Sequence, residues 1–147
     1  MENFNFQFMS NQLNKPLMVA LPATMFEAVD VKDVKTASFS TVKYQENKCY
    51  DNVVKTLLKH MGDNPNLLFC IGLHQLVDKP EQIVEHCWFE ENGQSYDFTS
   101  ELPEARHYKY LSLSLEELLM VMDSLRTETV PNIIEFYGWA QHQAQAN

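Results

Sequence analysis

Apolar residues recur at helical spacing in two segments of the chain. In the first segment they are Val53, Val54, Leu57, Leu58 and Met61. Gly62 follows as a stop signal, so Cys49 is predicted to lie in or just before the first turn of this helix. Before the second segment, Ser114 and Glu117 have the spacing of a capping box. The apolar stripe of that helix comprises Leu115, Leu118, Leu119, Met122 and Leu125.

Other segments have the patterns of strands. Residues 67–73 form a continuous apolar run, which predicts a central strand that is apolar on both faces. The segments 84–88 and 96–98 each alternate in polarity, and the turn signal at 91–93 between them predicts a hairpin. Pairing about that turn brings His86 and Asp97 near each other. The pattern leaves open the register, which decides whether the two side chains share a face.

The two ends of the chain are less regular. Phe4, Phe6 and Phe8 alternate with polar residues, as in a half-buried strand or a docked arm. Residues 17–21 form a buried strand or a covering loop, 27–35 at best one short helix or an irregular segment, and 37–44 a strand or an extended lead-in. One more strand is predicted near 108–111. A short last helix is predicted to begin at Pro131 and to fray from Gln141.

Together these elements predict an α+β protein with a single domain over residues 1–147. Within it, 1–44 is an N-terminal extension packing on a core of 45–112, and 113–140 is a C-terminal helical part. A chain of 147 residues with 45% hydrophobic residues is long enough to bury a core without disulfides or metal. The odd number of cysteines favours a reducing cytoplasm. The sequence shows neither a secretory signal nor an apolar run of membrane-spanning length, so no membrane partner is expected.

The net charge of −9 lies entirely in residues 76–147, because the acids and bases of residues 1–75 cancel, seven against seven. An acidic half argues against nucleic-acid binding through phosphates, which requires a basic face. Two interpretations remain. In the first, the acidic half attracts a basic partner or mimics nucleic acid. In the second, which is the commoner case, it is a solvated face that keeps the protein soluble.

The order of a helix at Cys49, a central strand, and strands with His86 and Asp97 resembles the minimal core of papain-like cysteine enzymes. The closest resemblance is to the transglutaminase-like branch. The matching residues are Cys49, the run ending at Gly72, His86-Cys87-Trp88-Phe89-Glu90, Gly93, and Asp97-Phe98-Thr99. They cover residues 45–100, with 37 residues from Cys49 to His86 (86 − 49) and 11 from His86 to Asp97 (97 − 86). The resemblance implies a papain-like or transglutaminase-like core, with the N-terminal catalytic helix packed on an antiparallel sheet.

The chemistry implied is acyl transfer through a Cys-His-Asp triad, on a protein, peptide or other amide substrate. Cys49 attacks a carbonyl carbon, His86 carries the proton, and Asp97 orients and stabilises the imidazole. The oxyanion donors are expected to be the backbone N–H of Cys49 and either the Gln45 side chain or a backbone N–H from the N-terminal segment. This reaction class includes amidohydrolases, proteases, deamidases and transglutaminases. The sequence does not identify the substrate.

Each of these residues also has a purely structural explanation. A cysteine at a helix start is more often packed than catalytic, and His86 and Asp97 are also consistent with a core histidine and a hairpin end. Trp88 is either core or a wall that shields the imidazole, while Cys70 and Cys87 are interpreted as core residues.

The other histidines, His60, His74, His107 and His142, have no partner at ligand spacing, so neither a metal nor a cofactor is expected. The alternative function is a catalytically inert binding or inhibitory protein on the same fold, such as a bacterial or phage accessory protein. Such a protein would act through its acidic C-terminal half.

Overall fold

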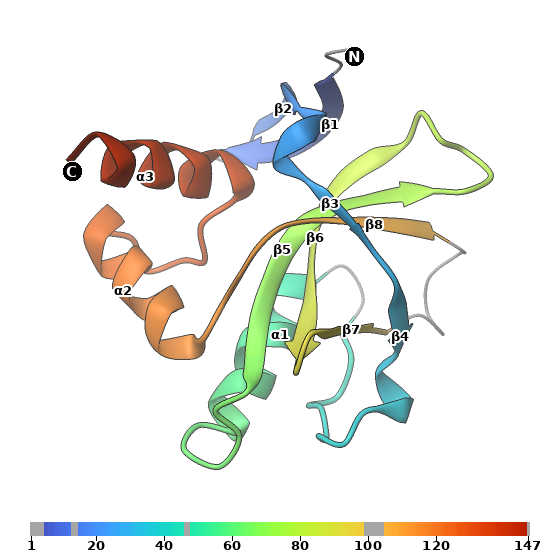
Figure 1. Cartoon of the computed structure of the whole chain (residues 1–147), viewed down its shortest axis with the longest axis vertical. Coiled ribbons are helices and arrows are strands. Elements are labelled where there is room, and N and C mark those ends of the chain that lie inside the picture. The colour runs from blue at the N-terminus through green and yellow to red at the C-terminus, as the bar shows by residue number, and fades with distance from the viewer. Residues whose placement is uncertain (1–4, 13–14, 46–47, 99–104, 147) are drawn as a thin grey trace.

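The computed structural model is an α+β protein in which three helices pack against the outer face of a strongly curled sheet (Figure 1). It describes residues 5–12, 15–45, 48–98 and 105–146. The helices are α1 (Cys49–Lys59), α2 (Leu115–Leu125) and α3 (Ile133–Ala146). The strands are β1 (Asn5–Gln12), β2 (Lys15–Pro22), β3 (Glu27–Val29), β4 (Val31–Asp33), β5 (Leu67–Leu76), β6 (Ile83–Glu91), β7 (Gln94–Asp97) and β8 (Ala105–Leu113).

The sheet is mixed and curls into a half-barrel. Its main path runs β2-β1-β6-β5-β8-β3, and β7 pairs with both β6 and β4. Only Asp30 separates β3 from β4, so the segment 27–33 pairs with β8 at one end and with β7 at the other. The pairs β1–β6 and β4–β7 are parallel, which corrects the expectation of a purely antiparallel sheet. The N-terminal segment also supplies strands of this sheet rather than only packing on it.

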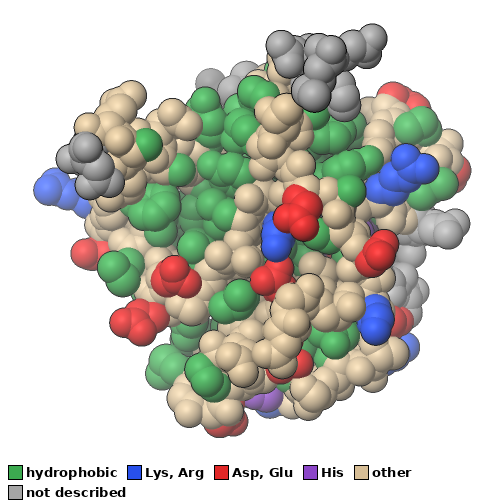
Figure 2. Space-filling model, viewed as in Figure 1, with side chains coloured by type: hydrophobic (Ala, Val, Ile, Leu, Met, Phe, Trp, Pro, Cys, Tyr) green, Lys and Arg blue, Asp and Glu red, His purple; other side chains and the backbone are tan. Residues whose placement is uncertain are grey.

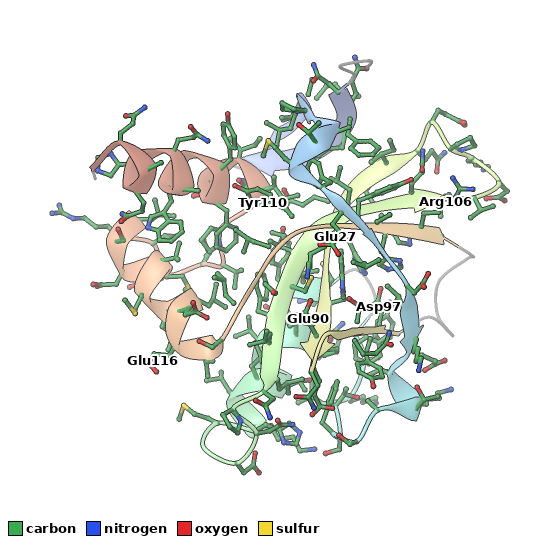
Figure 3. All side chains as sticks on the ribbon, viewed as in Figure 1. Glu27, Glu90, Asp97, Arg106, Tyr110 and Glu116 are labelled. Carbon is green, nitrogen blue, oxygen red and sulfur yellow. The ribbon has the colours of Figure 1, made fainter. Side chains whose placement is uncertain are left out.

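The two faces of the curl differ in chemistry. Phe69, Ile71, Leu73, Cys87, Phe89 and Leu113 belong to the core that also includes residues of the three helices. The opposite face, inside the curl, carries polar and small residues: Cys70, Gly72 and His74 of β5, His86 and Glu90 of β6, Asp97 of β7, and His107 and Lys109 of β8. β5 is the predicted central strand, and its run 67–73 has no polar side chain on either face; the inner face becomes polar only beyond that run, at His74. Glu90 and Asp97 lie within the curl (Figure 3).

Several predicted elements are confirmed. α1 begins at Cys49, and α2 begins with the Ser114–Glu117 capping box. β6 and β7 form the predicted hairpin, with a tight turn in which Asn92 (φ 52°) and Gly93 (φ 84°) take the left-handed conformation. An Asn-Gly pair is suited to such a turn because neither residue is strongly penalised at positive φ.

Other predictions needed correction. Residues 27–35 form no α-helix but two three-residue strands and the start of a 3-10 turn at Val34–Thr36. Residues 37–44 are irregular, although Phe39 is buried in the core. The last helix does not fray from Gln141 but continues to Ala146. In the N-terminal alternation Phe8 is buried in β1, and Phe4 lies outside the described residues.

The surface seen in Figure 2 carries apolar side chains around α3 and the N-terminal strands, with charged side chains scattered elsewhere. Few histidine side chains are visible on this face. Two of the histidines, His74 and His107, are buried and do not reach the surface. In the described part of the chain, none of the helices combines the length and the apolar character needed to cross a membrane.

Candidate functional site

Cys49 is the first residue of α1, where backbone N–H groups have no partner within the helix. The chain just before it is fixed by Asn52, a buried residue of the same helix. The Asn52 side chain donates to the Gln45 carbonyl at 2.9 Å and accepts from the Gln45 N–H at 3.1 Å. These two hydrogen bonds fix the backbone of Gln45, four residues before Cys49, against the first turn of α1.

A gap along β6 brings Cys49 close to the sheet. On the side of β6 away from β5, the described residues pair with β1 at Val84 and with β7 from Phe89 onward. Cys87 lies between these two pairings, and its thiol and backbone are close enough to Cys49 to lower the pKa of the Cys49 thiol by hydrogen bonding. The sulfur therefore sits at a strand edge, from which it also reaches the ring of His86.

The surroundings of Cys49 favour its thiolate. Hydrogen bonding by the Cys87 thiol is the largest influence, and together with the His86 ring and its charge it outweighs burial and lowers the pKa of Cys49 to about 5. Burial raises the pKa of Cys87 well above the ordinary value, so Cys87 stays a thiol and acts as the donor. Cys87 is a core residue as predicted, but it also contacts the candidate nucleophile, which strand alternation did not suggest.

His86 and Asp97 meet inside the curl. The hairpin register pairs Phe89 with Tyr96, which places Asp97 on the face that carries His86 and Trp88. The Nε2 atom of His86 donates to Oδ2 of Asp97 at 2.8 Å. Nδ1 is then the ring nitrogen that remains for Cys49. The structure thus answers the question of register that the sequence left open.

The charges of this pair are mutually stabilised. Burial alone would lower the pKa of His86, but the charge and hydrogen bond of Asp97, with a further contribution from Cys49, raise it to about 10. Burial would raise the pKa of Asp97, yet the charge of His86 and hydrogen bonds from His107 and His86 bring it well below its usual range. The His86 side chain keeps 15% of its surface exposed. These shifts favour a thiolate on Cys49, an imidazolium on His86 and a carboxylate on Asp97.

Two further histidines belong to this cluster, and sequence spacing did not reveal them. His107 of β8 donates from Nε2 to the same oxygen of Asp97 at 2.9 Å. His74 of β5 lies directly opposite His107 in the ladder, with its ring 5.1 Å from that of His86. The expectation that these histidines have no partner at ligand spacing does not hold for His107, which the fold brings together with His86 and Asp97. Both histidines occupy inner-face positions, His74 on β5 beside β6 and His107 on β8 beyond β5, so their approach to His86 follows from a strand order that local sequence does not specify.

Trp88 forms the wall of the cluster. It is fully buried, and its ring stacks with His86 at 6.0 Å and meets His107 edge-on at 5.0 Å. Gly72 makes room for it, since a Cβ there would lie 2.8 Å from the Trp88 ring. Trp88 is therefore a buried residue that also lies beside the imidazole, and the shielding role stays a prediction.

The remaining candidates are less defined. Gln45 is exposed, and its hydrogen bonds to Asn52 involve its backbone, so the role of its side chain as an oxyanion donor stays a prediction. Thr99 lies outside the described residues. Cys70 is fully buried, and burial raises its pKa, so it has the character of a core residue.

A second network supports the site from the helical side. The Tyr50 hydroxyl, next to Cys49, donates to the carboxylate of Glu85. The other oxygen of Glu85 accepts the backbone N–H of Ile133, the first residue of α3, at 2.8 Å. One carboxylate therefore links the start of α1, strand β6 and the start of α3 beside the reactive pair.

His86, Asp97 and His107 also have the donor atoms of a metal site. One ligand atom from each lies within 4.8 Å of the others. Two imidazoles and a carboxylate suit zinc and similar transition metals.

Comparison of the chain with family models, with curated proteins and with solved structures gave no match. The functional interpretation therefore depends on the geometry of the site.

Proposed function

We propose that this protein is a cysteine-dependent acyl-transfer enzyme with Cys49 as nucleophile, His86 as proton carrier and Asp97 as the group that orients His86. The observation that carries the proposal is the 2.8 Å bond from Nε2 of His86 to Asp97, which leaves the other ring nitrogen for a cysteine held as thiolate. A positioned base between a nucleophile and an orienting carboxylate is the arrangement that nucleophilic catalysis requires.

The reaction proceeds in two halves. The Cys49 thiolate attacks the carbonyl carbon, and the backbone N–H at the start of α1 stabilises the oxyanion. The imidazolium of His86 gives its proton to the leaving group, and the C–N or C–O bond breaks to leave a thioester. Water or an amine then attacks the thioester and His86 takes the proton of that nucleophile, after which the Cys49 thiolate leaves. Asp97 stabilises the charged imidazole at the start and at the end of this cycle.

The finer fold assignment, a papain-like or transglutaminase-like core, belongs to the same proposal. Support comes from the order of elements: the cysteine helix, the central strand β5, the histidine strand β6 and the aspartate strand β7. A reduced thiolate also requires a reducing compartment, so we place the protein in the cytoplasm.

The alternative, an inert protein that binds partners through its acidic half, is less well supported. Many acids of that half satisfy groups of the protein itself. Glu90 pairs with Lys109 at 2.8 Å, and Glu91 accepts from Ser38 and Asn64. The others with internal hydrogen-bond partners are Glu85, Asp97, Glu117 and Glu135. These carboxylates are engaged within the fold rather than presented to a partner.

An activated ester tests the proposal without knowledge of the substrate. Full-length protein mixed with p-nitrophenyl acetate should release a burst of p-nitrophenolate, and mass spectrometry should find the acetyl group on Cys49. Cys49→Ala should abolish the burst, and His86→Ala should slow acylation by about 10²–10⁴-fold, the usual contribution of a general acid-base group. Cys70→Ala is the matched control, and it should retain the burst because Cys70 is fully buried and burial raises the pKa of its thiol, which therefore stays protonated. A burst that survives Cys49→Ala would contradict the proposal.

A further inference from the structure

Three imidazoles and one carboxylate gather inside the curl. The Nε2 atoms of His86 and His107 both point at Oδ2 of Asp97, at 2.8 and 2.9 Å. The His74 ring lies 5.1 Å from the His86 ring and 5.3 Å from the His107 ring. The triad proposed above uses one of these histidines. His74 and His107 therefore need a separate explanation.

His74 carries a buried nitrogen without a partner. The residue is only 6% exposed, and its Nε2 has no hydrogen-bond partner in the described part of the protein. Buried polar atoms are nearly always satisfied, so an exception suggests an ion, a water or a ligand. A neutral imidazole is a good metal ligand.

We propose that His86, Asp97 and His107 bind a divalent transition-metal ion such as Zn²⁺, with His74 as the candidate fourth ligand. Zinc bonds of about 2.0–2.2 Å at tetrahedral angles separate neighbouring ligand atoms by about 3.3 Å. The present 2.8 and 2.9 Å contacts therefore need to open by a few tenths of an ångström, and the two Nε2 atoms, which lie within 4.8 Å of each other, need to reach the same separation. Imidazole and carboxylate together favour zinc-like ions over Mg²⁺ or Ca²⁺, which take oxygen ligands.

Metal binding would also act on the proposed chemistry. The ion and the Nε2 proton of His86 compete for the same lone pair, and a bound ion would hold the ring away from its proton-carrying role. The metal-bound protein should therefore be inactive in acyl transfer and regain activity when a chelator removes the ion. This consequence rests on the proposed function, whereas the binding itself does not.

Cobalt titration of the chelator-treated, full-length protein tests the site directly. One equivalent of Co²⁺ should bind and give visible d–d bands, without the sulfur-to-cobalt charge-transfer band of a thiolate ligand. His107→Gln should weaken binding at least about tenfold, the loss that even second-shell changes cause at metal sites. His142→Gln on the exposed part of α3 is the matched control and should bind as the wild type does.

Three outcomes would overturn the metal site. Failure of the wild type to bind Co²⁺, or equal binding by His107→Gln, excludes this ligand set. A charge-transfer band that disappears in Cys49→Ala would place the ion on the thiolate instead. The wild-type spectrum decides the question even where His107→Gln does not fold. Acylation of Cys49 in chelator is measured independently, so failure of the metal site and failure of the enzyme proposal are distinguishable.

Discussion

At the scale of residues, the main feature of the site is the number of protons that Cys49 and His86 bind together and the residue that carries them. In the folded protein the pair carries one proton, on His86, between pH values of about 5 and 10. In the unfolded chain the two groups have their ordinary pKa values of 9.0 and 6.5, so between those values the pair also carries one proton, on the cysteine. The proton moves between residues on folding, but the number bound does not change.

This balance predicts a flat stability profile for the chelator-treated protein between pH 6.5 and 9. Below 6.5 the unfolded chain binds a proton on His86 and another on His74, whose folded pKa of about 4 lies below the ordinary 6.5. The unfolded chain also keeps the Cys49 proton, whereas the folded state keeps only the proton on His86. The unfolded chain therefore binds two more protons, and stability falls as pH decreases by up to about 2.7 kcal/mol per pH unit. Above 9 the folded state keeps protons on His86, Cys70 and Cys87 that the unfolded chain has lost, and stability falls again.

Urea unfolding at a series of pH values measures this profile. In Cys49→Ala the unfolded chain has no cysteine proton at this position. In the folded variant Asp97 still raises the pKa of His86, which therefore stays protonated. The stability of that variant should decrease as pH rises above 6.5. A wild-type profile that slopes steadily from pH 6.5 to 9 would show that the thiolate–imidazolium pair does not form.

At the scale of elements, the close packing of β5 and β8 holds the histidine cluster together. At Gly72 the ladder shifts register, and the backbone of Tyr108 comes so near that an added Cβ would lie 2.0 Å from its carbonyl oxygen. The same Cβ would lie 2.8 Å from the ring of Trp88. Glycine is therefore required at this position by contact with backbone, not by its own dihedral angles.

Gly72→Ala should destabilise the protein by about 1–3 kcal/mol or more, because β8 must move away from β5. Since β8 carries His107, the variant should also acylate Cys49 more slowly. Gly138→Ala is the matched control: it lies in α3 with open space around it, and alanine in a helix should be neutral or stabilising by up to about 1 kcal/mol. Thermal melts of the two variants make the comparison, and equal effects would contradict this account of the β5–β8 contact.

At the scale of the whole molecule, local patterns predicted the elements and their chemistry better than their arrangement. The start of α1 at Cys49 and the hairpin at Asn92-Gly93 follow from signals within a few residues, and both are confirmed. The crossing of 27–33 between β8 and β7 depends on contacts between distant parts of the chain. Three-residue strands have too few positions to show an alternation, so this segment was not recognised as strand.

The same limit applies to the site. The proximity of His86 and Asp97 was predictable because a tight turn joins their strands. His107 reaches Asp97 only because β8 returns beside β5, a pairing that local sequence does not specify. The contact of Cys87 with Cys49 needs the gap between β1 and β7 on the edge of β6. Both residues therefore required the fold to be known.

The rate of Cys49 alkylation as a function of pH tests the central claim most directly. With iodoacetamide and chelator present, Cys49 should react from a pH of about 5 upward, as expected for its lowered pKa. At pH 6 it should react about tenfold or more faster than an ordinary thiol, because a larger thiolate fraction outweighs the lower nucleophilicity. His86→Ala should move the profile to higher pH. Labelling of Cys49 only above about pH 8, or a His86→Ala profile identical to that of the wild type, would contradict a cysteine activated by this histidine.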